Sequence, residues 1–301
     1  MRILAPDGIE TVAEKELCEM GHQVIKTAYT PEQLADALSD ADVLIVRSAT
    51  KVRKPVIDVA VKANKLKMIL RGGVGMDNID VDYARSQGII VENTPTASTN
   101  AVAEMAIAHM LSVSRFIGEA THTMRNGQWE KKAFKGTELF GKTLGVIGFG
   151  RIGRRTAELA KAFGMEIIAY NRSQCDEGRA LGEYVSLEEL FRRSDIITMH
   201  LPGAPEGIPL VRSETISQMK DGVIIINTGR GNLINEADLI RALDSGKVAA
   251  AGLDVYVGEP DVNKALVSHP HISCTPHIGA STKEAQGRIA KELVKHIKSI
   301  A

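Results

Sequence analysis

Short apolar runs rich in β-branched residues alternate with longer amphipathic stretches along most of the chain. The first series predicts strands at residues 3–5, 24–25, 43–46, 68–70 and 89–91. Helical patterns fall between them, near residues 10–20 and 31–39. A second series predicts strands at residues 143–147, 167–169, 196–199, 223–226 and 250–253. Parallel strands need long crossovers, usually helices, so the alternation predicts an α/β protein with two doubly wound parallel sheets.

A different pattern separates the two series. Residues 100–125 are rich in Ala, Met and Ile, with no proline and a single glycine. The stretch predicts one long helix that is apolar around much of its circumference, and so is buried between domains or against a second subunit. Because such a face needs a partner, we expect a symmetric homodimer.

The last segment predicts a helix that docks through one apolar stripe. Ser281 and Glu284 have the spacing of a capping box, in which each side chain satisfies a free backbone N–H. Apolar residues then recur every four positions, at Ala285, Ile289, Leu293 and Ile297.

Composition narrows the class of protein. Lys+Arg and Asp+Glu both number 37, so the net charge is zero and no global field attracts nucleic acid or an acidic membrane surface. Three scattered cysteines form no disulfide framework, and we expect reduced thiols. The N-terminus lacks the apolar region of a signal peptide, and no apolar run approaches the length of a membrane span. We therefore expect a cytoplasmic, two-domain enzyme that binds small molecules.

A glycine motif directly follows the strand at 143–147 and opens a helix. It reads Gly148-Phe149-Gly150-Arg151-Ile152-Gly153. Gly148 allows a tight turn, Gly150 lets the backbone approach a pyrophosphate, and Gly153 lets the helix pack close to the strand. The free N–H groups and partial positive charge of the helix N-terminus favour phosphate. Strand, turn and helix together predict a dinucleotide-binding site.

The next strand ends without the acidic residue that binds the ribose hydroxyls in many NAD sites. Asn171 and Arg172 stand there instead. Asn171 would not repel a 2′-phosphate, and Arg172 can pair with one. Alternatively, Arg172 points into water and NAD still binds, so the choice between NAD and NADP stays open.

Three downstream segments carry further candidate chemistry. They are residues 227–231 (Asn-Thr-Gly-Arg-Gly), 252–260 and 275–280 (Thr-Pro-His-Ile-Gly-Ala). Arg230 and Glu259 come just after predicted strands, where doubly wound sheets place their ligands. A histidine titrates near neutral pH and can exchange a proton with an alcohol, and a carboxylate beside it stabilises the imidazolium. An arginine offers a planar fork for a substrate carboxylate.

With these segments, the sequence resembles the D-2-hydroxyacid dehydrogenase family over essentially its whole length. The resemblance implies that Arg230 grips the substrate carboxylate, that His277 is the acid/base and that Glu259 orients it. It places Asp254 near the nicotinamide, and we expect His200 and Thr228 on the cofactor side as well. The family relation further implies a flavodoxin-like substrate domain, residues 1–94 with 280–301, and a Rossmann NAD(P)-binding domain, residues 95–279. The substrate would bind in a deep cleft between the two domains.

Within the family, residues 47–52, 134–139 and 279–286 look like 3-phosphoglycerate dehydrogenases of serine biosynthesis. The resemblance implies that backbone N–H groups at Gly73 and Val74 hold the substrate carboxylate. Arg47, Lys51 and Arg71 would form a cationic rim for a phosphate. The alternative is a solvated basic edge on a reductase for small unphosphorylated acids such as glyoxylate or hydroxypyruvate.

Three further expectations complete this interpretation. The chain ends after the docking helix, so we expect a short form without C-terminal regulatory domains and without inhibition by serine. His269-Pro270-His271 is expected to be a loop, not part of a metal site. The rival from another class is an NAD(H)-sensing corepressor that resembles this family, because fold alone does not establish catalysis.

Overall fold

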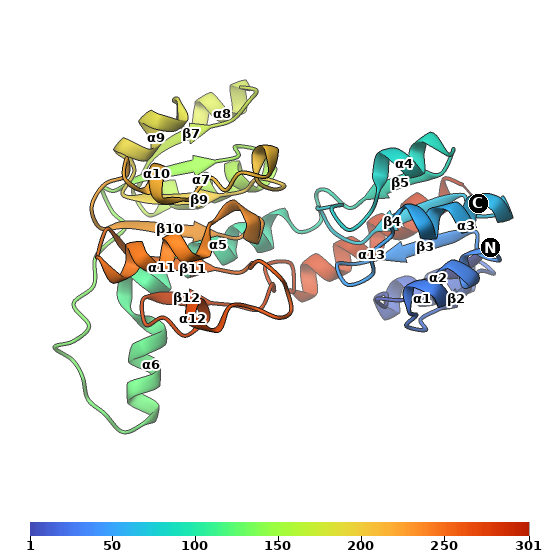
Figure 1. The fold of residues 1–301 in the computed structure, drawn as a ribbon, viewed down its shortest axis with the longest axis horizontal. Helices are drawn as coiled ribbons and strands as arrows, with labels where there is room; N and C mark the ends of the chain where they lie inside the picture. The colour runs from blue at the N-terminus through green and yellow to red at the C-terminus, as the bar shows by residue number, and fades with distance from the viewer. Residues whose placement is uncertain (301) are drawn as a thin grey trace. The chain divides into compact units, whose positions relative to one another are not determined.

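The computed structural model describes residues 1–300, which divide into two compact units (Figure 1). Unit 1 comprises Met1–Ser98 and the C-terminal segment that begins at Ala280. Unit 2 comprises Thr99–Gly279. Each unit contains its own sheet and its own hydrophobic core.

The sheet of unit 1 has five parallel strands in the order β2-β1-β3-β4-β5. The strands are β1 (Arg2–Leu4), β2 (Gln23–Ile25), β3 (Val43–Val46), β4 (Met68–Arg71) and β5 (Ile90–Asn93). The helices are α1 (Thr11–Glu19), α2 (Pro31–Leu38), α3 (Lys54–Ala63), α4 (Val81–Ser86) and α13 (Lys283–Lys298). Side chains of α2, α3 and α4 pack on one face of the sheet, and those of α1 and α13 pack on the other.

The helix α13 docks as its apolar stripe predicts. Ala285, Ile289, Leu293 and Ile297 are all buried in the core beneath it. The predicted cap is wrong by one residue: Thr282, not Ser281, accepts the N–H of Ala285 at 3.1 Å. The hydroxyls of both residues suit a cap, so sequence spacing alone did not separate them.

The sheet of unit 2 is also parallel, in the order β12-β11-β10-β9-β6-β7-β8. The strands are β6 (Thr143–Ile147), β7 (Glu166–Tyr170), β8 (Glu183–Tyr184), β9 (Ile196–Met199), β10 (Val223–Asn227), β11 (Val248–Leu253) and β12 (Ile272–Cys274). The longer helices are α5 (Thr99–Arg115), α6 (Ile117–Arg125), α7 (Arg151–Ala162), α9 (Leu187–Arg193) and α11 (Glu236–Asp244). The shorter ones are α8 (Asp176–Leu181), α10 (Ser213–Ile216), α12 (Lys264–Val267) and the 3₁₀ turns Pro205–Gly207 and Gly231–Leu233. The predicted pair of doubly wound parallel sheets is confirmed.

In each sheet the strand order reverses at one position, where ligands of such folds bind. In unit 2 the reversal lies between β6 and β9, so the chain leaves their carboxyl ends at Gly148 and His200. In unit 1 it lies between β1 and β3, where Asp7 accepts hydrogen bonds from the backbone N–H of Arg47, at 2.7 Å, and from Thr50.

The single helix expected at residues 100–125 is wrong. Phe116 has left-handed backbone angles, and α5 and α6 meet there at 63°. The reason is a non-local cap: the N–H of Thr137 bonds to the carbonyl of Ser114 at 2.9 Å, and Phe134 packs against Phe116.

The apolar surface of α5 is covered within unit 2. Its side chains pack against α7 and the β10–β12 strands. Neither a domain boundary nor a second subunit is therefore needed to bury α5. In Figure 1, α6 and the segment that follows it extend away from the sheet of this unit. Within residues 1–300, no single helix is long and apolar enough to cross a membrane. Only α5 and α6 taken together reach that length, and they are bent relative to each other.

Candidate active site

The glycine motif of unit 2 forms a turn that leaves room for a ligand. Gly148 has φ 90°, and a Cβ there would lie 2.8 Å from the backbone of His200. A Cβ on Gly153 would lie 2.2 Å from the carbonyl oxygen of Gly148, so α7 packs against the turn only without a side chain. At Gly150, the N-cap of α7, nothing lies within 4 Å of the Cβ position. The space over Gly150 and the free N–H groups of α7 suit a phosphate.

Other residues of the motif have separate roles. Phe149 is buried, and its ring packs edge-on against Tyr184, so only its backbone can face a ligand. Arg151 is exposed and Ile152 is partly buried. At the end of β7, the Oδ1 of Asn171 accepts the N–H of Phe149 at 3.3 Å, and its amide donates to the carbonyl of Ser173. Arg172 is exposed.

Two buried polar atoms at neighbouring strand ends lack a hydrogen bond within the described residues. They are the Nδ1 of His200, after β9, and the Oγ1 of Thr228, after β10. Unsatisfied buried polar atoms are costly and usually mark a place where a ligand or water binds. With the space over Gly150, these residues fit a bound dinucleotide.

Arg230 follows β10, and the next residue of its loop has no room for a side chain. A Cβ at Gly231 would lie 2.0 Å from the backbone carbon of Tyr256, so glycine is required there. The side chain of Asn227 donates to the carbonyl of Arg230 at 2.8 Å and accepts the N–H of Gly229 at 3.0 Å. These contacts fix the loop, and the charge of Arg230 acts on Glu259.

Glu259 and His277 form a direct pair. The Nδ1 of His277 lies 2.6 Å from the Oε2 of Glu259, and the Oε1 of Glu259 accepts the N–H of Tyr256 at 2.8 Å. Both side chains are about one-third exposed. With Nδ1 directed to the carboxylate, the Nε2 of His277 is the nitrogen left to exchange a proton with a substrate.

Glu259 stays ionised despite its burial. Burial raises the pKa of this carboxyl, but the hydrogen bonds from His277 and Tyr256 and the positive charges of His277 and Arg230 outweigh it. The net result is a pKa below the ordinary value of 4.5. The site therefore holds a fixed negative charge on the far side of the imidazole from Nε2.

A largely apolar cavity of about 330 Å³ adjoins the pair. Tyr256, Pro260, Val262 and Pro276 line it together with Glu259 and His277. Elsewhere in unit 2, His269 and His271 lie in a loop, their rings 5.6 Å apart. No group of three His, Cys, Asp or Glu side chains among residues 1–300 is placed to hold a metal ion.

Two cations of the predicted phosphate rim lie after β3 of unit 1. The guanidinium of Arg47 pairs with Glu10 at 3.0 Å, and its backbone N–H is held by Asp7. Lys51 is exposed. The sequence interpretation missed Asp7 and Glu10, whose carboxylates partly neutralise this edge, because they are far from Arg47 in sequence.

Arg71, Gly73 and Val74 follow β4 of the same sheet. The Nη1 of Arg71 donates to the carbonyl of Gly72 at 3.1 Å and occupies the space where a Cβ on Gly73 would lie. Gly73 has φ 150° and donates its N–H to the carbonyl of Arg71. The carbonyl of Val74 accepts from the side chain of Asn93 at 2.6 Å.

Asp254 belongs to a buried network that sequence analysis did not foresee. Its side chain is 1% exposed and accepts hydrogen bonds from the Thr275 hydroxyl and from the N–H groups of Ile278 and Gly279. Thr275 also contacts His109, which comes from α5. His109 carried no local signal, because only the packing of α5 on β12 brings it to this loop.

Comparison with known proteins agrees with this geometry. Residues 107–279 match the family described as D-isomer specific 2-hydroxyacid dehydrogenase, NAD binding domain. A D-3-phosphoglycerate dehydrogenase from Methanocaldococcus jannaschii is 45% identical over 303 residues, covering 99% of this chain. The chain spans 57% of the length of that relative.

Two further relatives carry reductase names. A hydroxypyruvate reductase from Thermotoga maritima is 48% identical over 269 residues, covering 88% of this chain and 87% of the relative. The crystal structure of a glyoxylate reductase from Paecilomyes thermophila is similar with a TM-score of 0.90 and 34% identity, covering 99% of this chain and 94% of that one.

Proposed function

Since the chain belongs to the D-isomer specific 2-hydroxyacid dehydrogenase family, we propose that it transfers a hydride between a nicotinamide dinucleotide and the second carbon of a D-2-hydroxy acid. The observation that carries the proposal is the 2.6 Å contact between His277 and Glu259, with the charge of Arg230 acting on the same carboxylate. The rival class, a nucleotide-sensing corepressor, has no need of such an acid/base pair.

Each side chain has one task in this reaction. Arg230 binds the substrate carboxylate through its planar guanidinium. In the oxidation direction, the Nε2 of His277 takes the hydroxyl proton, and Glu259 stabilises the imidazolium that results. When bound, the nicotinamide ring accepts or supplies the hydride. The N–H groups at Gly150 and α7 hold the pyrophosphate, with His200, Thr228 and Asp254 also assigned to the cofactor.

For the substrate we propose 3-phosphoglycerate, which is oxidised to 3-phosphohydroxypyruvate. The 45% identity to a D-3-phosphoglycerate dehydrogenase supports it, and Arg47, Lys51 and Arg71 are the proposed phosphate contacts, with Gly73 and Val74 for the carboxylate. The second candidate is the reduction of hydroxypyruvate or glyoxylate. It is supported by the hydroxypyruvate reductase that is 48% identical and by the pairing of Arg47 with Glu10.

The choice between NAD and NADP depends on the end of β7. Asn171 is engaged with Phe149 and Ser173, which leaves the exposed Arg172 as the residue able to meet a 2′-phosphate. We propose that both cofactors bind, and that Arg172→Ala reduces kcat/KM for NADP(H) more than for NAD(H).

The test is an absorbance assay of nicotinamide oxidation and reduction with a panel of 2-hydroxy and 2-oxo acids and both cofactors. We expect activity with phosphoglycerate or hydroxypyruvate, and a loss of ~10²–10⁴-fold in kcat for His277→Ala, the usual contribution of an acid/base group. His271→Ala, in an exposed loop, is the matched control. Absence of activity across the panel, or unchanged turnover of His277→Ala, would refute the proposal.

We also propose that the protein is a cytoplasmic homodimer that forms through α6 and the segment after it. No residue of α6 is buried, and Ile117 and Met124 are 51% and 54% exposed. Trp129 and Phe140 are exposed as well, at 77% and 75%. Grouped apolar exposure of this kind is typical of a surface that another chain covers.

A further inference from the structure

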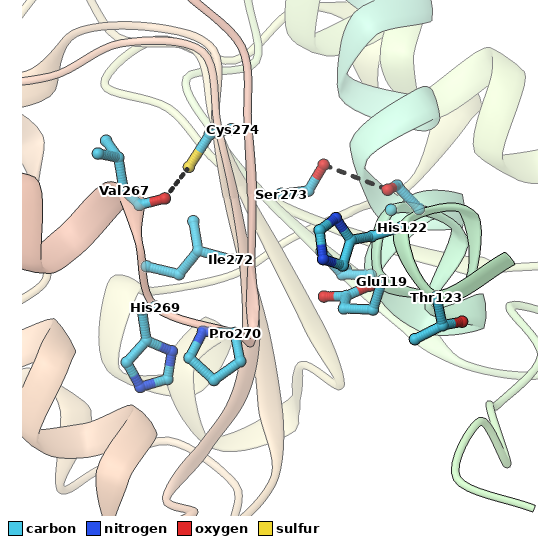
Figure 2. A pocket seen from close by; sticks show the side chains of 12 residues that line it. Glu119, His122, Thr123, Val267, His269, Pro270, Ile272, Ser273 and Cys274 are labelled. Carbon is cyan, nitrogen blue, oxygen red and sulfur yellow. Dashed lines mark hydrogen bonds between the residues drawn. The ribbon is translucent and has the colours of Figure 1, made fainter. Parts of the chain in front are cut away.

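A partly buried row of hydrogen bonds connects α5 to the loop that carries His277. The hydroxyl of Thr275 lies 2.6 Å from the carboxylate of Asp254 and 3.0 Å from the Nε2 of His109. The row continues from the Nδ1 of His109 to Ser273 (3.1 Å) and from Ser273 to Ser112 (3.2 Å). Ser112 and Ser273, at the outer end of the row, line a cavity of about 500 Å³, in which Figure 2 labels Ser273.

The carboxylate of Asp254 sets the direction of the two hydrogen bonds nearest to it. An ionised carboxylate can only accept, so the Thr275 hydroxyl donates its single proton to Asp254. The Thr275 oxygen must then accept from His109, which requires the proton of His109 on Nε2. The Nδ1 of His109 is left as an acceptor. The Ser273 hydroxyl has one proton, for Nδ1 or for Ser112, and it satisfies Nδ1 when Ser112 donates to Ser273.

Burial keeps His109 in this neutral form. The residue is 2% exposed, and burial lowers the pKa of its ring, although the charge of Asp254 opposes that effect. A neutral imidazole has one N–H, and the row directs that N–H to Thr275. His109 is therefore a fixed donor at a defined point, held from the other side by Ser273.

The loop at the other end of the row needs such support. His277 has φ 54°, a left-handed conformation that is unfavourable for residues with a Cβ and persists only where surrounding contacts enforce it. The two carboxylate oxygens of Asp254 accept the N–H groups of the next two residues, Ile278 at 2.8 Å and Gly279 at 2.7 Å. The position of the Asp254 carboxylate thus determines the backbone on which His277 is mounted.

We propose that His109 is a positioning residue for His277, acting through Thr275 and Asp254 without touching substrate or cofactor. The inference rests on the proposed function, since it assumes that His277 is the acid/base. His109 would then affect catalysis, although other buried side chains of α5 pack in the core of unit 2.

Three substitutions separate this role from simple packing. His109→Gln keeps an N–H donor at the place of Nε2, His109→Asn reaches only the place of Nδ1, and His109→Leu fills the space without a donor. We expect His109→Leu and His109→Asn to lower kcat by up to about tenfold, the effect of losing one hydrogen bond in a charged network. His109→Gln should restore most of the rate. His271→Leu, in an exposed loop and outside the row, is the control.

A second readout does not depend on activity. Hydrogen exchange followed by mass spectrometry reports the N–H groups of residues 275–279, and we expect faster exchange in His109→Leu and His109→Asn than in wild type or His109→Gln. Unchanged exchange and kcat in His109→Leu would overturn the proposal. Equal impairment of all three variants, in step with their melting temperatures, would overturn it too. If the wild type proves inactive, the proposed function fails, whereas the exchange data still decide whether His109 holds the loop.

Discussion

At the scale of single residues, the contact between Glu259 and His277 helps to determine the pKa of the Glu259 carboxyl. Burial raises the pKa of this carboxyl, and the hydrogen bond from His277 is the largest effect that lowers it, followed by the hydrogen bond from the N–H of Tyr256 and the charge of His277. We predict that His277→Ala raises the pKa of Glu259 relative to wild type, because burial is then less fully opposed. A carbon-13 NMR titration of the glutamate carboxyls measures it.

The sign for stability follows from the same pKa. In wild type the folded pKa lies below 4.5, so Glu259 stabilises the fold above pH 4.5 and this contribution is lost as pH falls through the folded value. In His277→Ala that acid-sensitive contribution should shrink. A variant whose Glu259 titrates as in wild type would show that His277 does not interact with the carboxylate in solution.

His200 contrasts with Glu259, because it is a base that burial keeps neutral. Part of the residue is exposed, but the ring Nδ1 is buried and has no hydrogen-bond partner within residues 1–300. Burial lowers the pKa of the ring from 6.5 to about 4. Between pH 6.5 and about 4, His200 is therefore protonated in the unfolded chain but not in the folded chain. The stability of the fold consequently falls as pH drops through this range. The loss is at most about 3.5 kcal/mol, because the shift from 6.5 to about 4 counts about 1.4 kcal/mol per pKa unit.

Urea unfolding of wild type and His200→Gln across this pH range isolates the effect. Other histidines also titrate here, so only the difference between the two proteins is assigned to His200. We expect the variant to lose less stability on acidification. Parallel pH profiles for the two proteins would mean that the pKa of the His200 ring is the same in the folded and unfolded states.

Arg47 decides between the two candidate substrates. If it contacts a phosphate, Arg47→Ala should lower kcat/KM for 3-phosphoglycerate by about 10- to 100-fold, the contribution of a hydrogen bond between charged groups, and affect D-glycerate much less. Glu10→Gln, which removes the negative charge that pairs with the guanidinium at 3.0 Å, should raise kcat/KM for the phosphorylated substrate. Equal losses with both substrates would exclude a phosphate site at Arg47.

At the scale of elements, two glycines of one turn differ in what they permit. Gly150 has ordinary backbone angles and open space at its Cβ position, whereas a Cβ on Gly153 would overlap the carbonyl of Gly148 at 2.2 Å. We predict that Gly153→Ala destabilises the protein by about 1–3 kcal/mol, the usual cost of overpacking. Gly150→Ala should leave stability intact but weaken NADH binding, because its methyl group occupies the space of the pyrophosphate. Thermal unfolding and a fluorescence titration with NADH measure the two effects, and a stable Gly153→Ala would contradict the packing argument.

The elements themselves were largely predictable because their signals are local. Strand runs, the glycine motif before α7 and the stripe of α13 each depend on neighbours in sequence. The break at Phe116 was not predictable, because the residue that caps α5, Thr137, lies far along the chain. The short strands β8 and β12 were also missed, since Glu-Tyr and Ile-Ser-Cys lack the adjacent aliphatic residues that marked the other strands.

The candidate site divides in the same way. Gly148, Arg230, Glu259 and His277 lie in motifs whose spacing points to a dehydrogenase. The acidic partners Asp7 and Glu10, and the support of Asp254 by Thr275 and His109, depend on contacts between distant segments. Sequence therefore indicates the reacting groups more readily than the residues that hold or neutralise them.

At the scale of the whole molecule, α6 and not α5 is the helix that favours a dimer. The apolar surface of α5 is already buried in unit 2, so it does not require a partner. Ile117 and Met124 are seven residues apart, which places both on one face of α6, and no residue of that helix is buried. Exposed apolar side chains so grouped are costly in a monomer, whereas a second copy of the chain would cover them.

We therefore predict that the protein has twice the 32.5 kDa mass of one chain in solution, and that Ile117→Glu with Met124→Glu shifts it to the monomer. Two carboxylates on one face cannot be buried against an apolar partner without a large desolvation cost, while in the monomer both remain in water. Val12→Glu, at a side chain 59% exposed on α1, adds the same kind of charge away from α6 and should leave the mass unchanged. Sedimentation velocity distinguishes the outcomes. A monomeric wild type, or a double variant that remains dimeric, would mean that α6 is not the contact face.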